Sequence, residues 1–114
     1  MIGPTNERLA FRDVEVVLRW WQGRRVRVEL THRPSEQDIA AVPESILQRI
    51  EPMPEDITGL AGDGLGLIFS DGDGASIFTL LVHEQLFDDA IEFDRELQIW
   101  LHDVEVIIQE AIGS

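Results

Sequence analysis

The feature that most constrains the fold is the alternation of apolar and polar residues between Asp13 and Thr31. Alternation with a period of two is typical of strands that bury one face. The apolar row consists of Val14, Val16, Leu18 and Trp20, followed by Val26, Val28 and Leu30. A three-residue turn at residues 22–24 keeps both parts of this row on one side, whereas a two-residue turn would mix the faces. We therefore predict a β-hairpin over residues 13–31.

The opposite face of this predicted hairpin is rich in arginine and tryptophan. The register places Trp21 opposite Arg25, and it places Arg19 beside Arg27. Guanidinium groups bind anions, and an indole ring offers a surface on which a nucleobase can stack. Arg19, Trp21, Arg25 and Arg27 are therefore candidate residues for binding an anion or a nucleic acid. The alternative is that these arginines shield a half-exposed tryptophan or pair with the acidic part of the chain.

A second alternating segment, residues 65–83, predicts another hairpin. One face carries Leu65, Leu67 and Phe69 together with Phe78, Leu80 and Val82. A loop of two or of four residues within Asp71–Gly74 gives the same register. The other face is also largely apolar, which indicates strands that are covered on at least one side.

Residues 35–50 show helical spacing. The apolar residues Ile39, Val42, Ile46 and Ile50 follow a Ser35–Asp38 capping pair. Pro43 interrupts the pattern, so we predict a short or kinked helical segment here.

The C-terminal stretch shows the longest helical pattern. Its members are Phe93, Leu97, Trp100, Leu101, Val104, Ile107, Ile108 and Ala111. Spacing of three and four residues over this length predicts an amphipathic helix over residues 89–112. A strand is the alternative, because the sequence "DVEVIIQ" alternates and is rich in β-branched residues.

These elements together predict an α+β fold. We expect an antiparallel sheet of two β-hairpins, a short central helical segment, and the long C-terminal helix packed on one face of the sheet. The 114 residues of the chain correspond to a single domain, residues 1–114.

Charge is distributed unevenly along the chain. The formal net charge is −13, yet residues 1–33 hold seven arginines and only four acids. All nine basic residues are arginine. Both this and the excess of acidic residues can reflect the codon usage or salt regime of the host as well as a function.

Cysteine is absent, which excludes disulfides and thiol chemistry. With no apolar leader and no apolar run long enough to span a bilayer, we expect a cytoplasmic protein that does not enter membranes.

The sequence shows no motif of a catalytic or metal site. The three histidines, His32, His83 and His102, are neither paired nor part of an HExxH pattern. The serines lack a GxSxG elbow, and the glycine-rich segment 59–66 lacks the lysine of a phosphate-binding loop. We therefore expect a protein that is not an enzyme and binds neither a metal nor a cofactor.

The function favoured by the sequence is that of a non-catalytic protein-interaction module, such as an inhibitor, immunity-type protein or adaptor. Its acidic C-terminal helix would dock a basic protein partner, with an apolar centre that sets the lifetime of the complex. The candidate partner-binding residues are Glu92, Glu96, Ile99, Asp103, Val106 and Glu110. The alternatives are the anion or nucleic-acid binder that uses the arginine and tryptophan face, which the net charge disfavours, and a structural subunit that self-associates, for example as a homodimer.

Overall fold

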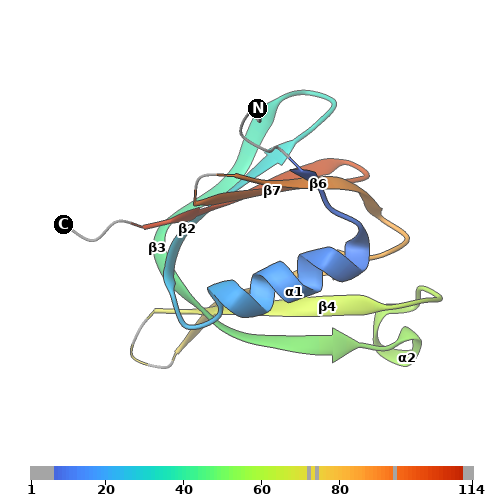
Figure 1. Ribbon diagram of the computed structural model, residues 1–114, viewed down its shortest axis with the longest axis horizontal. Coiled ribbons are helices and arrows are strands. Elements are labelled where there is room, and N and C mark those ends of the chain that lie inside the picture. The colour runs from blue at the N-terminus through green and yellow to red at the C-terminus, as the bar shows by residue number, and fades with distance from the viewer. Residues whose placement is uncertain (1–6, 72, 74, 94, 112–114) are drawn as a thin grey trace.

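The computed structural model of the protein describes residues 7–71, 73, 75–93 and 95–111. Within these residues, eight strands form one antiparallel sheet in the order β1-β6-β7-β8-β2-β3-β4-β5. The strands are β1 (Glu7–Arg8), β2 (Arg25–His32), β3 (Gln37–Met53), β4 (Gly64–Ser70), β5 (Ser76–His83), β6 (Phe87–Phe93), β7 (Glu96–Leu101) and β8 (Val104–Glu110), and the helices are α1 (Phe11–Trp21) and α2 (Glu55–Thr58). The sheet folds over into two layers with α1 between them (Figure 1).

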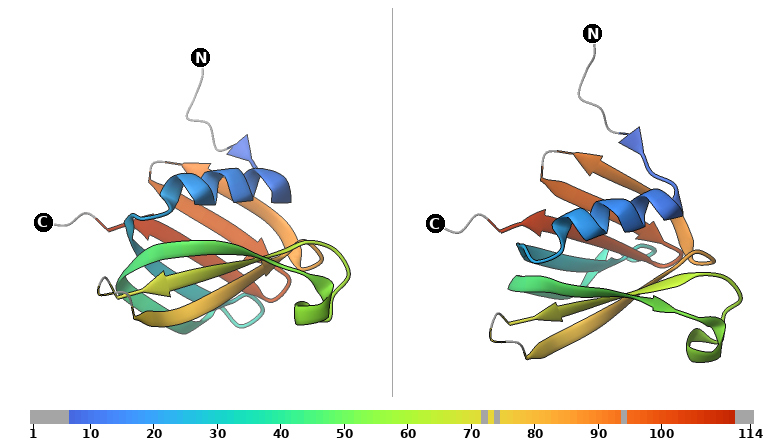
Figure 2. Two further views of the ribbon diagram at one scale, coloured as in Figure 1. Left: turned by 90° about the horizontal axis from the view of Figure 1, so that it is seen from below. Right: turned by 60° about the horizontal axis from the view of Figure 1, so that its bottom comes forward.

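The long strand β3 is what bends the sheet. Its register shifts at two places against β2 and at one place against β4, and each time β3 contributes one residue more than its neighbour. Such β-bulges increase the local twist and bend of the strand that carries them. Pro43 lies within one of these bulges, where its missing N–H group is tolerated. β3 can therefore run from the upper layer into the lower one (Figures 1 and 2).

Helix α1 fills the concave side of this curved sheet. Ala10 caps its start and donates its N–H group to the carboxylate of Asp13 over 3.2 Å, and the chain leaves the helix through Gly23, which has a positive φ of 87°. Its side chains Val14, Leu18 and Trp21 are buried, and they recur at the spacing of one helix face.

The inner faces of the strands complete the core around α1. One row crosses three strands through Ala90, Ile99 and Val106, all of them completely buried. In the lower layer the rings of Phe69 and Phe78 stack with their centroids 4.6 Å apart. Among the described residues, neither helix has the length and the apolar character needed to cross a membrane.

The first predicted hairpin is wrong in its first half. Residues 11–21 form α1, and only the second predicted strand exists, as β2. The two patterns share residues: Val14 and Leu18 belong both to the alternating row and to a helix face that continues to Trp21. Burial of that helix face against the sheet decides the outcome, because tertiary packing overrides a local pattern of this length.

The predicted long C-terminal helix is also wrong, and with it the predicted α+β arrangement. Residues 87–93, 96–101 and 104–110 are the strands β6, β7 and β8, so the strand alternative describes this region. The polar pair His102–Asp103 is the turn between β7 and β8. It divides one apparent helical pattern into two alternating runs.

The helical segment predicted over residues 35–50 is wrong for a related reason. Residues 37–53 form β3, whose bulges move apolar side chains out of strict alternation and so produce a spacing that resembles a helix. The short helix of this region is α2, which lies after it.

The second predicted hairpin is confirmed as β4 and β5. The predicted inner face is as observed, but the register is shifted by two residues. Leu65 pairs with Val82, Leu67 with Leu80 and Phe69 with Phe78, because Ser70 pairs with Ser76 and Ile77 forms a bulge. Two residues of its predicted turn, Gly72 and Gly74, lie outside the described residues.

The position of Ile99 yields a test of this fold. Ile99 is 0% exposed between its neighbours Ala90 and Val106. We expect Ile99→Ala to lower the free energy of unfolding by about 2–5 kcal/mol, because it leaves a cavity in the core. Ile39→Ala, which truncates an exposed isoleucine of β3, should cost less than about 0.5 kcal/mol. Urea denaturation followed by far-UV circular dichroism measures both, and a near-neutral Ile99→Ala would contradict the strand assignment.

Candidate protein-interaction surface

The outer face of α1, which points away from the sheet, carries two of the most exposed large apolar side chains of the described residues. Val16 is 69% exposed and Trp20 is 66% exposed, one helical turn apart. The outer face consists of Arg12, Asp13, Val16, Arg19 and Trp20, all of them exposed and all on one arc of the helix. A tryptophan left this open is unusual in a folded protein, since burying its ring releases more water than burying almost any other side chain.

The polar groups around Val16 and Trp20 nearly balance in charge. Arg19 donates to the carboxylate of Glu15 over 2.9 Å on the same helix. Arg12 and Asp13 add one charge of each sign. The outer face is therefore an apolar centre with a neutral polar rim, on a chain whose formal net charge is −13.

Arg24 fixes the ring of Trp20 from one side. Its guanidinium carbon lies 3.9 Å from the centre of the Trp20 ring. Contacts of this kind between a cation and an aromatic face contribute about 0.5–1 kcal/mol at exposed sites. Arg24 thus favours one orientation of the Trp20 ring while most of its surface stays open.

A hollow of about 400 Å³ lies beside Trp20 at the C-terminal end of α1. It is lined by Trp20, Trp21, Arg24, Glu92, Arg95 and Glu110. Glu110 lies between two arginines, 3.9 Å from Nη1 of Arg24 and 3.5 Å from Nε of Arg95. Within the described part of the chain, no ion pair is found for Glu92, so this carboxylate is open to a cation from outside.

A second hollow, of about 360 Å³, lies at the other end of α1. It is lined by Phe11, Arg12 and Glu15 of the helix region and by Pro52, Met53, Pro54, Asp63, Gly64 and Leu65 of the lower layer. The outer face of α1 is therefore a ridge with a depression at each end, which suits insertion of side chains from a partner.

The predicted partner-binding residues do not form one surface. Ile99 and Val106 are opposite each other on β7 and β8 and completely buried in the core, so neither can reach a partner. The helix that would have presented them does not exist. Glu92 and Glu110 do come together, at the hollow beside Trp20.

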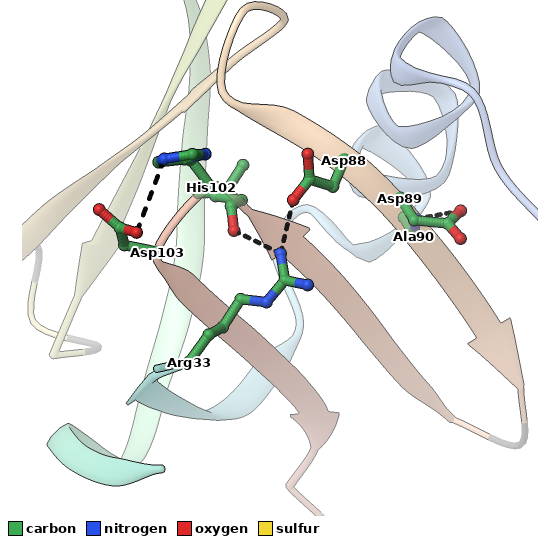
Figure 3. A network of polar contacts seen from close by, with 7 residues as sticks. Arg33, Asp88, Asp89, Ala90, His102 and Asp103 are labelled. Carbon is green, nitrogen blue, oxygen red and sulfur yellow. Dashed lines mark hydrogen bonds and ion pairs between the residues drawn. The ribbon is translucent and has the colours of Figure 1, made fainter. Parts of the chain in front are cut away.

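Glu96 and Asp103 lie apart from that hollow. Glu96 accepts a hydrogen bond from the side-chain amide of Gln109 over 2.7 Å across the β7–β8 pair. Asp103 is in the turn at the other end of this pair, with His102 3.8 Å away (Figure 3). In the same region Arg33 donates to the carboxylate of Asp88 over 2.6 Å and to the carbonyl oxygen of Leu101 over 2.8 Å, which ties the end of β2 to β6 and β7 (Figure 3).

The predicted anion-binding residues are separated as well. Trp21 is buried, and Arg19 projects from α1 while Arg25 and Arg27 project from β2. Each of the three arginines is paired with a carboxylate: Glu15, Glu44 and Glu29 respectively. The positive charge that an anion would need is thus largely neutralised.

The histidines show no shared site. His83 is completely buried at the end of β5; its Nδ1 accepts the N–H group of Gln85 over 3.0 Å, and its Nε2 has no partner among the described residues. His32 contacts the hydroxyl of Ser35. Over the described ranges, no group of three or more histidine, aspartate or glutamate side chains is placed to hold a metal ion.

Sequence reasoning missed the importance of Val16 and Trp20 because it assigned both to the inner row of a strand. The signal was present. On a helix, the set Phe11, Val14, Leu18 and Trp21 accounts for one complete apolar face, and Val16 and Trp20 are then the residues left over.

No protein-family model, no curated protein and no solved structure matches this chain. The geometry of the outer face of α1 and its two hollows is therefore the basis for a functional proposal.

Two adjacent tryptophans test the division of α1 into a buried and an open face. Trp21, 3% exposed, should cost about 3–5 kcal/mol of unfolding free energy when changed to alanine. Trp20→Ala removes only an exposed ring and its contact with Arg24, so we expect a loss of about 1 kcal/mol or less. Chemical denaturation of the two variants measures the difference. Equal losses would mean that Trp20 belongs to the core.

Proposed function

We propose that this protein is a non-catalytic interaction module that binds another protein through the outer face of α1. The observation that carries the proposal is the exposure of Val16 and Trp20 on a helix whose other face is fully used by the core. Because these two side chains stay largely exposed, they contribute little to the free energy of folding. A partner that covers them would recover the free energy of burying both.

The surroundings of Trp20 support this proposal. Tryptophan and arginine are the residues most often found to dominate binding energy at protein interfaces, and such residues typically lie in an apolar centre with a polar rim. Because Arg24 already orders the Trp20 ring, binding requires less loss of side-chain freedom than it would for a mobile tryptophan.

The charge of the chain favours a basic partner. A net charge of −13 produces a long-range field that attracts cationic proteins and raises their rate of association. The rim of the outer face is neutral and does not oppose them at short range. Glu92, in the adjacent hollow, can receive a lysine or arginine of the partner. A cytoplasmic location, which agrees with the absence of cysteine, is part of the same proposal.

The function of an anion or nucleic-acid binder has less support. It needs several unpaired cations on one surface, whereas Arg19, Arg25 and Arg27 each face a carboxylate.

The test uses capture in the cells that naturally contain the protein. A photo-crosslinking amino acid replaces Arg12, which is exposed on the outer face, and a matched chain carries it at Ile57 of α2, which is as exposed as Trp20. We expect a discrete crosslinked protein of basic isoelectric point only from the position on α1. Identification of that protein allows its affinity to be measured directly.

Trp20→Ala should weaken this affinity about 30-fold or more, as expected for a central interface tryptophan. Val16→Arg should weaken it as well, whereas Ile57→Ala should leave it unchanged. Added salt should slow association and leave dissociation nearly unaffected. Binding that survives both α1 substitutions would contradict the docking site, and a partner of acidic isoelectric point would contradict the electrostatic part of the proposal.

A further inference from the structure

The outer edge of β5 is an open strand edge. β5 is the last strand of the sheet and hydrogen-bonds to β4 on one side (Figure 2). Among the described residues, no backbone hydrogen bond joins Ser76–Val82 to any segment except β4. Every second residue of the edge of an antiparallel strand presents its N–H and C=O groups outward, so β5 offers a template for one more strand.

β5 also lacks most of the features by which proteins protect such edges. Its sequence, "SIFTLLVH", contains no proline and no acidic or basic residue apart from a terminal histidine, in a chain that is 27% charged. One bulge, at Ile77, leaves Phe78–His83 in regular pairing with β4. At the opposite edge of the sheet, the described part of β1 consists of two charged residues, Glu7 and Arg8, and β6 beside it carries Asp88 and Asp89. Natural edges are usually blocked by short length, charge or bulges, and among the described edges that of β5 has the least such protection.

We propose that β5 pairs with β5 of a second copy of this chain, antiparallel and about a two-fold axis, to give one continuous sheet across a homodimer. In such a pair the two-fold axis passes beside one residue of the strand. Each residue before that position lies opposite the residue the same number of positions after it in the second copy. With the axis at Leu80, Phe78 lies opposite Val82 of the second copy and Thr79 lies opposite Leu81.

This register preserves the two faces of the sheet. Phe78, Leu80 and Val82 form the inner row of β5, and they meet the same inner row of the second copy. Phe78 and Leu80 are only partly buried in one chain, so pairing covers apolar surface that a single chain leaves open. The exposed Ile77, 44% accessible, lies where the second copy would cover it.

A second copy fits this edge better than an unrelated strand because the pairing is closed and self-matching. Two-fold pairing uses the β5 edge of both chains, so association through this edge stops at two chains and does not continue into a filament. No acidic or basic side chain of Phe78–Val82 meets its like at the seam. About six backbone hydrogen bonds would form between the two strands. The contact is small, and we expect a dimer that depends on concentration.

The charges at the two ends of β5 give this dimer a distinctive salt dependence. Asp71 and Asp73 precede the strand and Glu84 follows it, and antiparallel pairing brings the start of one strand to the end of the other. These acids, and the net charge of −13 on each copy, repel at low salt. Added salt screens that repulsion, so dimerisation should strengthen with salt, whereas the docking of a basic partner should weaken.

Sedimentation of the whole chain over a range of concentrations tests the proposal. We expect a reversible monomer–dimer equilibrium whose dissociation constant falls when salt is raised. Thr79→Glu, which adds a further negative charge beside the axis in both copies, should raise that constant at least tenfold. Ile57→Glu is the matched control, since it adds the same charge at an exposed site on α2 and should leave the equilibrium within about twofold. Circular dichroism and thermal unfolding of both variants check that they fold.

The absence of cysteine from the chain permits a second readout. Single-cysteine variants Leu80→Cys and Ile57→Cys are oxidised under identical conditions. We expect a disulfide-linked dimer from Leu80→Cys and little from Ile57→Cys, because only a residue on the axis meets its own copy.

Several results would overturn the proposal. A chain that stays monomeric at the highest accessible concentration and salt would do so. Dimerisation unchanged by Thr79→Glu would as well, and if Trp20→Ala abolished it instead, the dimer would form through the outer face of α1. Failure of the proposed function would appear separately, as loss of partner capture in a chain that still dimerises.

Discussion

The packing of α1 into the concave face of the sheet is the interaction on which the rest of the structure depends. Val14, Leu18 and Trp21 are buried in one core cluster with the inner side chains of both layers, such as Leu67 and Ile99. The helix geometry then determines what remains outside. Residues one turn apart share a face, so burial of the row containing Val14 and Leu18 places Val16 and Trp20 on the opposite arc. The core and the proposed interaction surface are thus two sides of one eleven-residue helix.

That packing is possible because β3 is not a regular strand. Seventeen residues of β3 pair with β2 and then with β4, and three extra residues along it absorb the bend between the two layers. A strand without bulges would keep the sheet open and leave α1 with one layer to cover. The two edges of the sheet differ in charge: the described part of β1 is the charged pair Glu7–Arg8, whereas residues 76–82 of β5 are uncharged.

The sequence predicts the parts of this fold in which local and tertiary patterns agree. The pairing of β4 with β5 follows from alternation on both sides of a turn, and β2 follows from Val26, Val28 and Leu30. The pattern fails where apolar residues satisfy two periods. Val14 and Leu18 fit both a strand row and a helix face, and Leu97, Leu101, Val104 and Ile108 fit a helix although a two-residue turn separates them into two strands. In β3 the bulges themselves create the misleading spacing, and only the one at Pro43 is marked by a local feature of the sequence.

The candidate site was less accessible to prediction than the fold. The acidic residues Glu92 and Glu110 do meet at one hollow, but they do so from different strands and beside tryptophans of the helix. Trp20 could be recognised as exposed only once α1 was known to be a helix. Residues far apart in the chain, such as Arg24, Arg95 and Glu110, come together through the order of strands in the sheet, which alternation alone does not specify.

Residue-resolved hydrogen exchange on the free protein tests most directly whether α1 is a fixed part of the core. If it is, the amides in the second half of α1 exchange only through global unfolding, with the same opening free energy as those of β2 and β8. Exchange in α1 that is faster by several orders of magnitude, with β2 and β8 still protected, would show that the helix undocks on its own. The outer face of α1 could then not serve as a preformed binding surface, and the dependence of the fold on this helix would be contradicted.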